Sequence, residues 1–273
     1  MSRLFQGANQ RLFGTWPLKG DQARDAILSA AEVGYRAFDT AQMYGNEAEV
    51  GQALRETGLG RNELLIQTKV HPDNYSRSDF LPSVERSLEA LGVDEVDILL
   101  LHWPPVGGAV EGPLDLLNQC LQRGFCREVG VSNFNLDMLR TAKDRLDAPV
   151  AVNQVEFHPL LDQSRLLSGA SAMGVPLSAY CSVAKGKVFE ESLLEEIGAL
   201  NGKSAAQVAL RWLLQKGVAP VTMSTKPANQ AANFDIMNFS LSNVEMAMID
   251  SLAVRRNYRI VDADRIAWAP KWD

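Results

Sequence analysis

The sequence predicts an α/β protein folded as a single (β/α)8 barrel. Short apolar or β-branched runs alternate with longer amphipathic segments through eight strand-and-helix units. No linker or change in composition divides the 273 residues, and barrels of this kind reach about 250 residues as one domain. The alternative is a doubly wound open sheet, which should begin with a glycine-rich turn; neither GxGxxG nor a Walker A pattern occurs. One domain over 1–273 is therefore expected.

The first half of the chain contains four of these units. Their strands and helices are expected at 11–16 and 21–33, 36–40 and 47–56, 64–70 and 78–91, and 96–101 and 113–123. Asp21 is a suitable N-cap for the first helix, and Gly34 ends it. Pro82 is tolerated in the first turn of the third helix. The fourth strand is almost wholly apolar, as a strand covered on both faces should be.

The second half contains four more strands and two helices beyond the eight of a simple barrel. The expected segments are 128–132 and 136–144, 150–156 and 163–173, 176–180 with 191–200 and 204–215, and 218–223 with 227–233 and 242–251. Ser204 is a suitable N-cap for the helix that follows it. Residues 252–273 are expected to form an irregular but ordered tail, because Trp268 and Trp272 would be unfavourable in solvent.

Composition and charge exclude several classes of function. A net charge of −6 disfavours non-specific nucleic-acid binding. The three cysteines, Cys120, Cys126 and Cys181, form no CxxC pair and are expected to be reduced thiols. The first ten residues lack the apolar region of a signal peptide, and no apolar run approaches the roughly 18 residues of a membrane span. A cytoplasmic protein is expected, with monomer as the default.

Polar residues stand at the ends of seven consecutive predicted strands. In a (β/α)8 barrel the carboxyl ends of the strands form the active site, so these side chains should meet at one mouth. They are Asp39, Lys69, His102, Ser132 with Asn133, Asn153 with Gln154 and Glu156, Tyr180, and Ser224 with Thr225.

Four residues near this mouth, Asp39, Tyr44, Lys69 and His102, together suggest an acid catalyst. Taken singly, Asp39 could form a structural salt bridge to Lys69, and Lys69 could be a solvated strand end. His102 could be a packing residue and Tyr44 a loop anchor. Together, Lys69 should lower the pKa of the Tyr44 phenol from its usual value of about 10, and Asp39 should hold Lys69. Tyr44 would then protonate a developing alkoxide while His102 orients the carbonyl oxygen.

This set favours carbonyl reduction with hydride supplied by a cofactor. It has no metal-ligand spacing, no activated serine or cysteine and no acid/base carboxylate pair. Two alternatives stay open. The barrel could bind a cofactor without catalysis, as a regulatory protein, or Lys69 could form a Schiff base with a substrate.

Six motifs, in order along nearly the whole chain, resemble those of the aldo-keto reductase superfamily. They are Gly14-Thr15-Trp16, Phe38-Asp39-Thr40-Ala41 with Tyr44-Gly45-Asn46-Glu47, Thr68-Lys69, Leu101-His102-Trp103-Pro104, Gly130-Val131-Ser132-Asn133-Phe134, and Asn153-Gln154-Val155-Glu156-Phe157-His158-Pro159. The ending, Ala269 to Asp273, is similar to the short tails of prokaryotic members of the 2,5-diketo-gluconate reductase type.

The resemblance implies NADPH or NADH lying across the mouth and a small-molecule carbonyl substrate. Tyr44 would be the proton donor, with Asp39, Lys69 and His102 completing a tetrad, and Trp16 and Trp103 would join Tyr44 and His102 in lining the substrate pocket. Implied partners of the nicotinamide carboxamide are Ser132, Asn133 and Gln154. Tyr180 would stack on the ring, next to a pyrophosphate loop. Including that loop, the implied cofactor residues are Gly14, Thr15, Trp16, Asp39, Ser132, Asn133, Gln154, Tyr180, Cys181, Ser182, Val183, Met223, Ser224, Thr225, Asn229 and Asn233.

One segment departs from the family pattern. After the eighth strand the family usually has Ile-Pro-Lys-Ser and then an arginine, but here Met223 replaces the lysine and Asn229 the arginine. These cations usually meet the 2′-phosphate of NADPH, and a charge-assisted contact is worth roughly 1.5–3 kcal/mol. Lys226 could replace part of the charge. Selectivity between NADPH and NADH is therefore expected to be weak.

Overall fold

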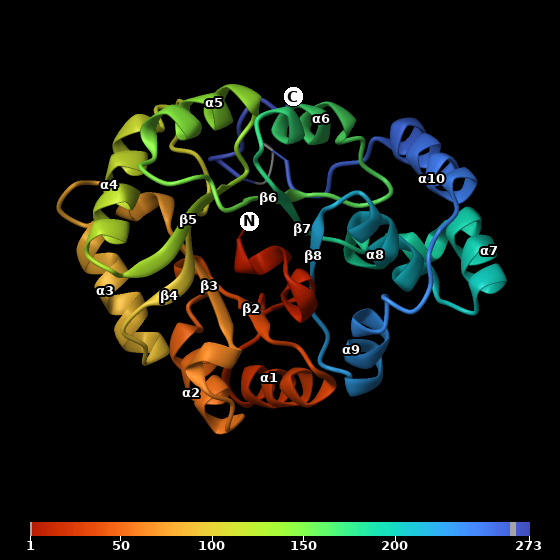
Figure 1. Ribbon diagram of the computed structural model, residues 1–273, viewed down its shortest axis with the longest axis horizontal. Helices are drawn as coiled ribbons and strands as arrows, with labels where there is room; N and C mark the ends of the chain where they lie inside the picture. The colour runs from red at the N-terminus through yellow and green to blue at the C-terminus, as the bar shows by residue number, and fades with distance from the viewer. Residues whose placement is uncertain (1, 263–265) are drawn as a thin grey trace.

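The computed structural model describes residues 2–262 and 266–273 and contains the expected barrel (Figure 1). Eight parallel strands pair in chain order, and β1 also pairs with β8, which closes the barrel. The strands are β1 Leu12–Gly14, β2 Ala37–Asp39, β3 Leu65–Val70, β4 Val96–Leu101, β5 Cys126–Ser132, β6 Asn153–Glu156, β7 Leu177–Tyr180 and β8 Ala219–Thr222.

Ten α-helices in the described residues surround the strands. They are α1 Gly20–Val33, α2 Glu47–Glu56, α3 Phe80–Leu91, α4 Glu111–Gln122, α5 Leu136–Arg145, α6 Ser164–Ala172, α7 Ser192–Asn201, α8 Ala205–Gln215, α9 Pro227–Phe234 and α10 Asn243–Arg256. The two helices beyond the expected eight are present. As predicted, Ser204 caps α8, accepting a hydrogen bond from the Gln207 N–H, and Gly34 lies just past α1 with a φ of 120°.

The helices pack because each buries one apolar side against the strands or a neighbouring helix. Ala23, Ile27 and Ala30 of α1 are buried, at the spacing of one helical face. Gly51 lets α2 approach α3 closely, since a Cβ at this position would lie 2.2 Å from the Leu91 carbonyl oxygen. Side chains larger than hydrogen at position 51 would therefore push these helices apart.

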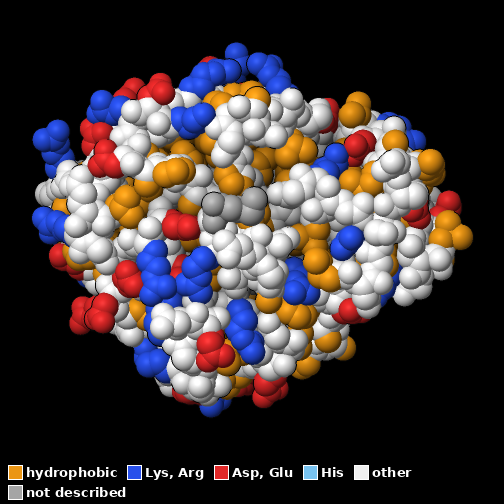
Figure 2. Space-filling view, viewed as in Figure 1, with side chains coloured by type: hydrophobic (Ala, Val, Ile, Leu, Met, Phe, Trp, Pro, Cys, Tyr) orange, Lys and Arg blue, Asp and Glu red, His pale blue; other side chains and the backbone are white. Residues whose placement is uncertain are grey.

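The N-terminal segment closes the end of the barrel opposite the carboxyl ends of the strands. Two short 3₁₀-helices, Arg3–Phe5 and Gly7–Gln10, place Leu4 in a buried cluster with barrel residues that include Leu12 and Ile98. In Figure 1 this segment lies over the centre of the strands (red). Basic and acidic side chains intermix on the same face (Figure 2). The sequence did not predict this closure.

Three of the basic side chains at this end of the barrel form ion pairs with the buried carboxylate of Asp97. It forms ion pairs with Arg3 and Arg61, both at 2.7 Å, and with Arg127 at 3.4 Å, and its Oδ2 accepts a hydrogen bond from the Ile66 N–H. A carboxylate out of water needs partners of this kind. This cluster therefore fixes the closed end of the barrel, away from the mouth.

Some predicted boundaries were wrong. Helix α10 continues to Arg256, well beyond position 251, because Leu252 and Ala253 are buried; Asn257 ends it in a left-handed conformation with a φ of 37°. A 3₁₀-helical stretch over Ala184–Glu190 was also not expected.

The tail is ordered in its described part, as predicted. The Trp268 ring packs edge-on against His71 at 5.3 Å, and the Trp272 ring against Trp103 at 6.4 Å. Residues 263–265 of the predicted tail lie outside the described residues. The chain ends beside α5 and α6 in Figure 1. The contacts with His71 and Trp103, which follow β3 and β4, place the described tail at the mouth.

Candidate active site

Three of the four candidate catalytic residues lie at the carboxyl ends of neighbouring strands. Asp39 is the last residue of β2, Lys69 lies one residue before the end of β3, and His102 directly follows β4. Tyr44 comes from a 3₁₀-helix over Gln42–Tyr44 that follows β2. The parallel pairing of neighbouring strands therefore brings these side chains together at the mouth.

Lys69 is the centre of this cluster. Its Nζ donates hydrogen bonds to Asp39 Oδ2 at 2.7 Å, to the Thr40 carbonyl oxygen at 2.9 Å and to the Tyr44 hydroxyl at 3.1 Å. The Lys69 side chain is fully buried and that of Asp39 is 4% exposed. The predicted contact between Asp39 and Lys69 is confirmed, and it compensates two charges that would be costly to bury alone.

The predicted net effect on Tyr44 was wrong. Burial raises the pKa of the Tyr44 phenol and outweighs the opposing effect of Lys69; Asp39 adds to the increase. The net pKa of Tyr44 is raised. The loss of water around the hydroxyl, which no sequence pattern shows, has a larger effect than the nearby ammonium.

Lys69 stays charged. Burial lowers its pKa, but Asp39 and Tyr44 outweigh that effect and the net pKa is raised. A lysine that attacks a carbonyl to form a Schiff base must be a neutral amine. The environment of Lys69 therefore disfavours that alternative.

His102 is a neutral imidazole. Burial lowers its pKa well below the usual value, and the positive charge of Lys69 adds to this decrease. Its ring meets the Tyr44 ring edge-on, with centroids 5.5 Å apart. Among the described residues, its buried Nδ1 has no hydrogen-bond partner. A neutral imidazole in this place can donate one hydrogen bond to a carbonyl oxygen without adding a charge.

Two glutamines hold the other side of Asp39. Gln67 Nε2 and Gln154 Nε2 both donate to Asp39 Oδ1, the latter at 3.0 Å. Gln67 was missed by the sequence analysis, although it precedes Lys69 by two residues and therefore faces the same side of β3. Gln154, which the resemblance assigned to the nicotinamide, supports the carboxylate in this structure.

The residues assigned to the nicotinamide ring form one hydrogen-bonded group. Tyr180 donates through its hydroxyl to Asn133 Oδ1 at 2.8 Å, and Asn133 Nδ2 donates to the His102 carbonyl oxygen at 3.0 Å. Ser132 Oγ donates to the Gln154 carbonyl oxygen at 2.7 Å. Asn133 adopts a left-handed backbone with a φ of 63°, which asparagine tolerates well. The phenol ring of Tyr180 is thereby fixed at the mouth, where it can stack on a planar ring.

The segment after β7 forms a tight loop. Ser182 Oγ donates to the Ala179 and Val221 carbonyl oxygens, at 2.8 and 2.9 Å. Cys181 has a φ of 53°. Burial raises the pKa of the Cys181 thiol to about 12, so it stays protonated and is a poor nucleophile. Val183 follows in the same loop.

Gly14 and Thr15 support the mouth from β1. A Cβ on Gly14 would lie 2.9 Å from Val221, which explains the glycine. Thr15 is buried, and its N–H and hydroxyl donate to the Asp39 carbonyl oxygen at 3.0 and 3.1 Å. Both residues therefore contact neighbouring strands, and Thr15 fixes the backbone of Asp39.

The segment that follows β8 lies partly in solvent. Met223 is 39% exposed, and the side chains of Thr225, Lys226 and Asn229 are also exposed. Gln230, which the sequence analysis missed, is buried and donates to the Ser224 carbonyl oxygen at 2.7 Å and to the Ala26 carbonyl oxygen at 3.0 Å. Asn233 is half-buried in α9. The loop therefore has a fixed backbone but, within 223–233, Lys226 as its one cation.

Aromatic rings pack around Tyr44 and His102. Trp16 is 55% exposed and lies 5.4 Å from the Tyr44 ring. The Trp103 ring stacks on that of His102, with centroids 6.5 Å apart, and its centroid lies 6.4 Å from that of Trp272. Trp16 and Trp103 were expected here. Trp272 was not, because its position depends on the path of the tail.

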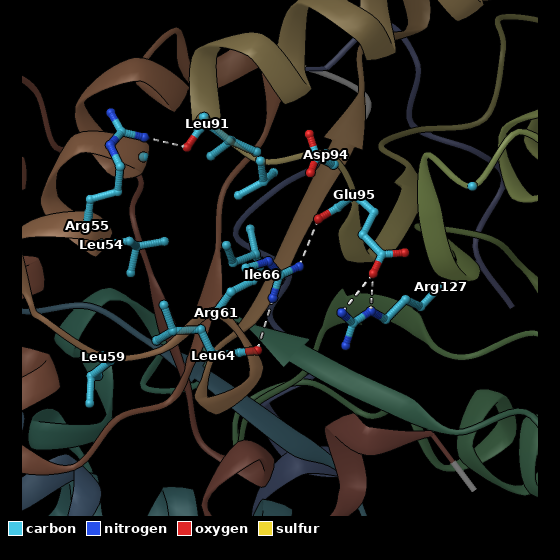
Figure 3. Close-up of a pocket in the computed structure, with 14 residues that line it drawn as sticks. Leu54, Arg55, Leu59, Arg61, Leu64, Ile66, Leu91, Asp94, Glu95 and Arg127 are labelled. Atoms are coloured by element: carbon cyan, nitrogen blue, oxygen red, sulfur yellow. Dashed lines mark hydrogen bonds and ion pairs between the residues drawn. The ribbon is translucent and has the colours of Figure 1, made fainter.

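A separate cavity of about 560 Å³ lies at the opposite end of β3 and β4 (Figure 3). Its arginines are engaged with the protein: Arg55 donates to the Leu91 carbonyl oxygen at 2.9 Å, and Arg61 to the Glu95 carbonyl oxygen at 2.8 Å. Arg127 pairs with the Glu95 carboxylate at 2.7 Å. This cavity therefore supplies neither a free cation nor any of the candidate catalytic groups.

Within the described residues, no group of three or more His, Cys, Asp or Glu side chains is placed to hold a metal ion. No described helix is long and apolar enough to cross a membrane.

Comparison with known proteins identifies the family. The model of the aldo/keto reductase family matches residues 4–254. The chain belongs to the aldo/keto reductase family. It is 37% identical to methylglyoxal reductase DkgB of Yersinia pestis over 264 residues, which cover 95% of this chain and 97% of that protein. It is 34% identical to 2,5-diketo-D-gluconic acid reductase B of Corynebacterium sp. (strain SHS752001), covering 92% and 90%.

Solved structures of family members have the same fold. A structure provisionally named 2,5-diketo-D-gluconic acid reductase B is 42% identical, with a TM-score of 0.94 over 100% of this chain and 97% of that one. An aldo-keto reductase of Bombyx mori, solved in complex with NADP, is 28% identical, with a TM-score of 0.86 over 94% and 92%. As a member of this family, the chain is an NAD(P)H-dependent oxidoreductase that reduces carbonyl groups.

Proposed function

We propose that Tyr44 protonates the carbonyl oxygen of an aldehyde or ketone during reduction to the alcohol. The observation that carries this proposal is the position of Lys69, whose Nζ contacts both Asp39 and the Tyr44 hydroxyl. The Tyr44 ring also packs edge-on against the His102 ring. A carbonyl oxygen placed between Tyr44 and His102 has one proton donor and one orienting hydrogen bond.

The proton balance follows from these contacts. A reduced nicotinamide, when bound, supplies the hydride to the carbonyl carbon. As negative charge develops on the carbonyl oxygen, the Tyr44 hydroxyl donates its proton and becomes a phenolate. The Lys69 ammonium stabilises that phenolate, and Asp39 keeps the ammonium in place. Solvent then returns a proton to Tyr44, so the tetrad is regenerated.

The residues at the mouth fit a nicotinamide cofactor. The fixed Tyr180 ring offers a stacking surface, and Ser132 and Asn133 provide polar atoms beside it. We propose that Gln154 acts chiefly through Asp39, with which it is hydrogen bonded. The loop with Cys181, Ser182 and Val183 would bind pyrophosphate.

We propose that the substrates are small aldehydes or ketones with apolar or sugar-like bodies. Trp16 and Trp103 supply the apolar walls. Relatives named for methylglyoxal and for 2,5-diketo-D-gluconic acid support small carbonyl compounds. A panel of such aldehydes and ketones, followed by cofactor oxidation, tests both this substrate class and catalysis itself. No turnover across the panel would favour a non-catalytic cofactor-binding protein.

The uncharged residues at positions 223 and 229 should weaken the preference for NADPH over NADH. Because Met223 and Asn229 carry no charge, we expect kcat/KM with NADPH to exceed that with NADH by less than about a hundredfold, or roughly 2.7 kcal/mol. Steady-state kinetics with both cofactors measures this ratio. The double substitution Met223→Lys and Asn229→Arg should raise it about 10- to 100-fold. A larger wild-type preference for NADPH would contradict the prediction.

We also propose that the chain acts as a single-domain monomer in the cytoplasm. The three cysteines are unpaired, as is usual for thiols in a reducing compartment. Sedimentation equilibrium of the purified protein tests the monomer.

A further inference from the structure

Tyr44 is carried by a single helical turn, which cannot hold its own place. The 3₁₀-helix has three residues, Gln42–Tyr44. The Tyr44 and Gly45 N–H groups close it by donating to the Ala41 and Gln42 carbonyl oxygens, both at 3.0 Å. One isolated turn is unstable in water, because fixing its backbone costs more free energy than its few hydrogen bonds return. Contacts between the turn and the rest of the barrel must therefore set the position of the Tyr44 ring.

Gln42, the first residue of this turn, joins it to two other elements through its side-chain amide. Its Oε1 accepts hydrogen bonds from the His71 N–H at 2.8 Å and from Asn74 Nδ2 at 2.9 Å, both in the segment after β3. Its Nε2 donates to α3, to the Ser83 carbonyl oxygen at 3.1 Å and to the hydroxyls of Ser83 and Ser87 at 3.2 and 3.1 Å. An amide has two N–H groups and two lone pairs, so these partners use its full capacity.

Two backbone partners explain why an amide suits this position. The His71 N–H can only donate a hydrogen bond, and the Ser83 carbonyl can only accept one, so they fix which end of the amide faces each of them. A carboxylate at position 42 would place an oxygen against the Ser83 carbonyl oxygen. An apolar side chain of the same length would leave the His71 N–H without its acceptor.

The buried carboxyl group of Glu47 connects this support to the strand that carries Lys69. Ser87 Oγ donates to Glu47 Oε2 at 3.1 Å, and Thr68 Oγ1 donates to Glu47 Oε1 at 2.5 Å. Burial raises the pKa of the Glu47 carboxyl, and the hydrogen bonds from Thr68 and Ser87 oppose that rise. Thr68 directly precedes Lys69 on β3. The elements that hold Gln42 are therefore hydrogen bonded to the strand on which the partner of Tyr44 lies.

We propose that Gln42 is a positioning residue for proton donation, and that its amide holds the Tyr44 hydroxyl at hydrogen-bonding distance from Lys69. The proposal rests on the proposed function, in which Tyr44 donates the proton. Gln42 precedes Tyr44 by about two-thirds of a 3₁₀ turn, so its side chain reaches α3 while the Tyr44 hydroxyl lies 3.1 Å from Lys69 Nζ. Lys19 Nζ holds the other end of the turn, donating to the Gly45 carbonyl oxygen at 2.7 Å. Without the Gln42 amide the turn keeps that anchor, but its side toward β3 and α3 is released.

The test compares Gln42→Met, which keeps the length of the side chain, with Asn118→Leu on α4. Asn118 is a buried amide that also serves one backbone acceptor and one backbone donor, the Arg145 carbonyl oxygen at 2.8 Å and the Asp147 N–H at 3.0 Å. Both variants should lower the urea midpoint, because each leaves a backbone N–H without its acceptor. In Gln42→Met, kcat for aldehyde reduction should fall about 10- to 100-fold, the effect of misplacing a reacting group by about 1 Å. The KM for cofactor should change less than about threefold, and Asn118→Leu should keep kcat within about twofold of wild type.

Nuclear magnetic resonance gives a readout that does not require turnover. In protein labelled with ¹³C at tyrosine Cζ, the signal of Tyr44 is identified by its loss in Tyr44→Phe. It should move in Gln42→Met, because the hydroxyl leaves Lys69, and stay in place in Asn118→Leu.

Three results would overturn the proposal. They are equal losses of kcat in the two variants, a kcat of Gln42→Met within about threefold of wild type, and an unchanged Tyr44 signal in Gln42→Met at whatever rate. If the wild type reduces no aldehyde but the Tyr44 signal moves as expected, the placement of Tyr44 by Gln42 is supported and the proposed function alone is contradicted.

Discussion

Tyr44→Phe should lower kcat/KM for aldehyde reduction by about 10²–10⁴-fold, the usual contribution of a general acid. Phenylalanine keeps the ring that packs against Trp16 and His102 but removes the only atom through which Tyr44 can donate a proton. Stopped-flow or steady-state assays of cofactor oxidation measure the loss. Cofactor affinity, followed by quenching of tryptophan fluorescence, should change less than about threefold.

Two controls make the Tyr44 result specific. Trp16→Phe alters the same wall without removing a proton donor, and we expect it to act mainly on KM. Turnover by Tyr44→Phe within tenfold of wild type would reject Tyr44 as the acid. A parallel loss of cofactor binding would show a structural role instead.

Lys69→Met should cause a comparable loss of activity and a large loss of stability. Removing the ammonium leaves Asp39 buried at 4% exposure without its cation, and breaking a buried pair by removing one partner costs about 3–5 kcal/mol. Urea denaturation measures the stability, and the aldehyde assay measures the rate. Gln67 and Gln154 still donate to Asp39, so the loss of stability should lie at the lower end of that range.

The double variant Asp39→Asn and Lys69→Met separates these two effects. It leaves no unpaired charge, so most of the stability should return, but the phenolate of Tyr44 still lacks a cation and activity should stay low. Recovery of activity together with stability would show that the pair serves folding alone.

The sequence predicted the barrel because strand signals and helix caps agree along the chain. The apolar run of β4 and the cap at Ser204 are local features. It did not predict the closure by Arg3–Phe5 and Gly7–Gln10, because those segments are too short to show a period. The extension of α10 was readable in part, since Asn257 is a typical residue after a helix end.

The sequence predicts the site residues that lie at the ends of single strands. It does not predict the properties of the site that arise from tertiary packing. Asp39, Lys69 and His102 follow from their places in β2, β3 and after β4. The pKa of Tyr44 is raised by burial, and the extent of burial cannot be inferred from a sequence motif. The contact of Trp272 with the pocket depends on where the tail crosses the mouth.

The pH dependence of kcat/KM tests most directly the claim that Tyr44 is an acid under the influence of Lys69. A general acid must be protonated, so activity should be present below the pKa of Tyr44 and fall as pH rises through it. Lys69 lowers that pKa more than Asp39 raises it. Removing both, in the double variant, should therefore move the descending limb to higher pH. A limb at the same pH in both proteins, at whatever absolute rate, would contradict the account.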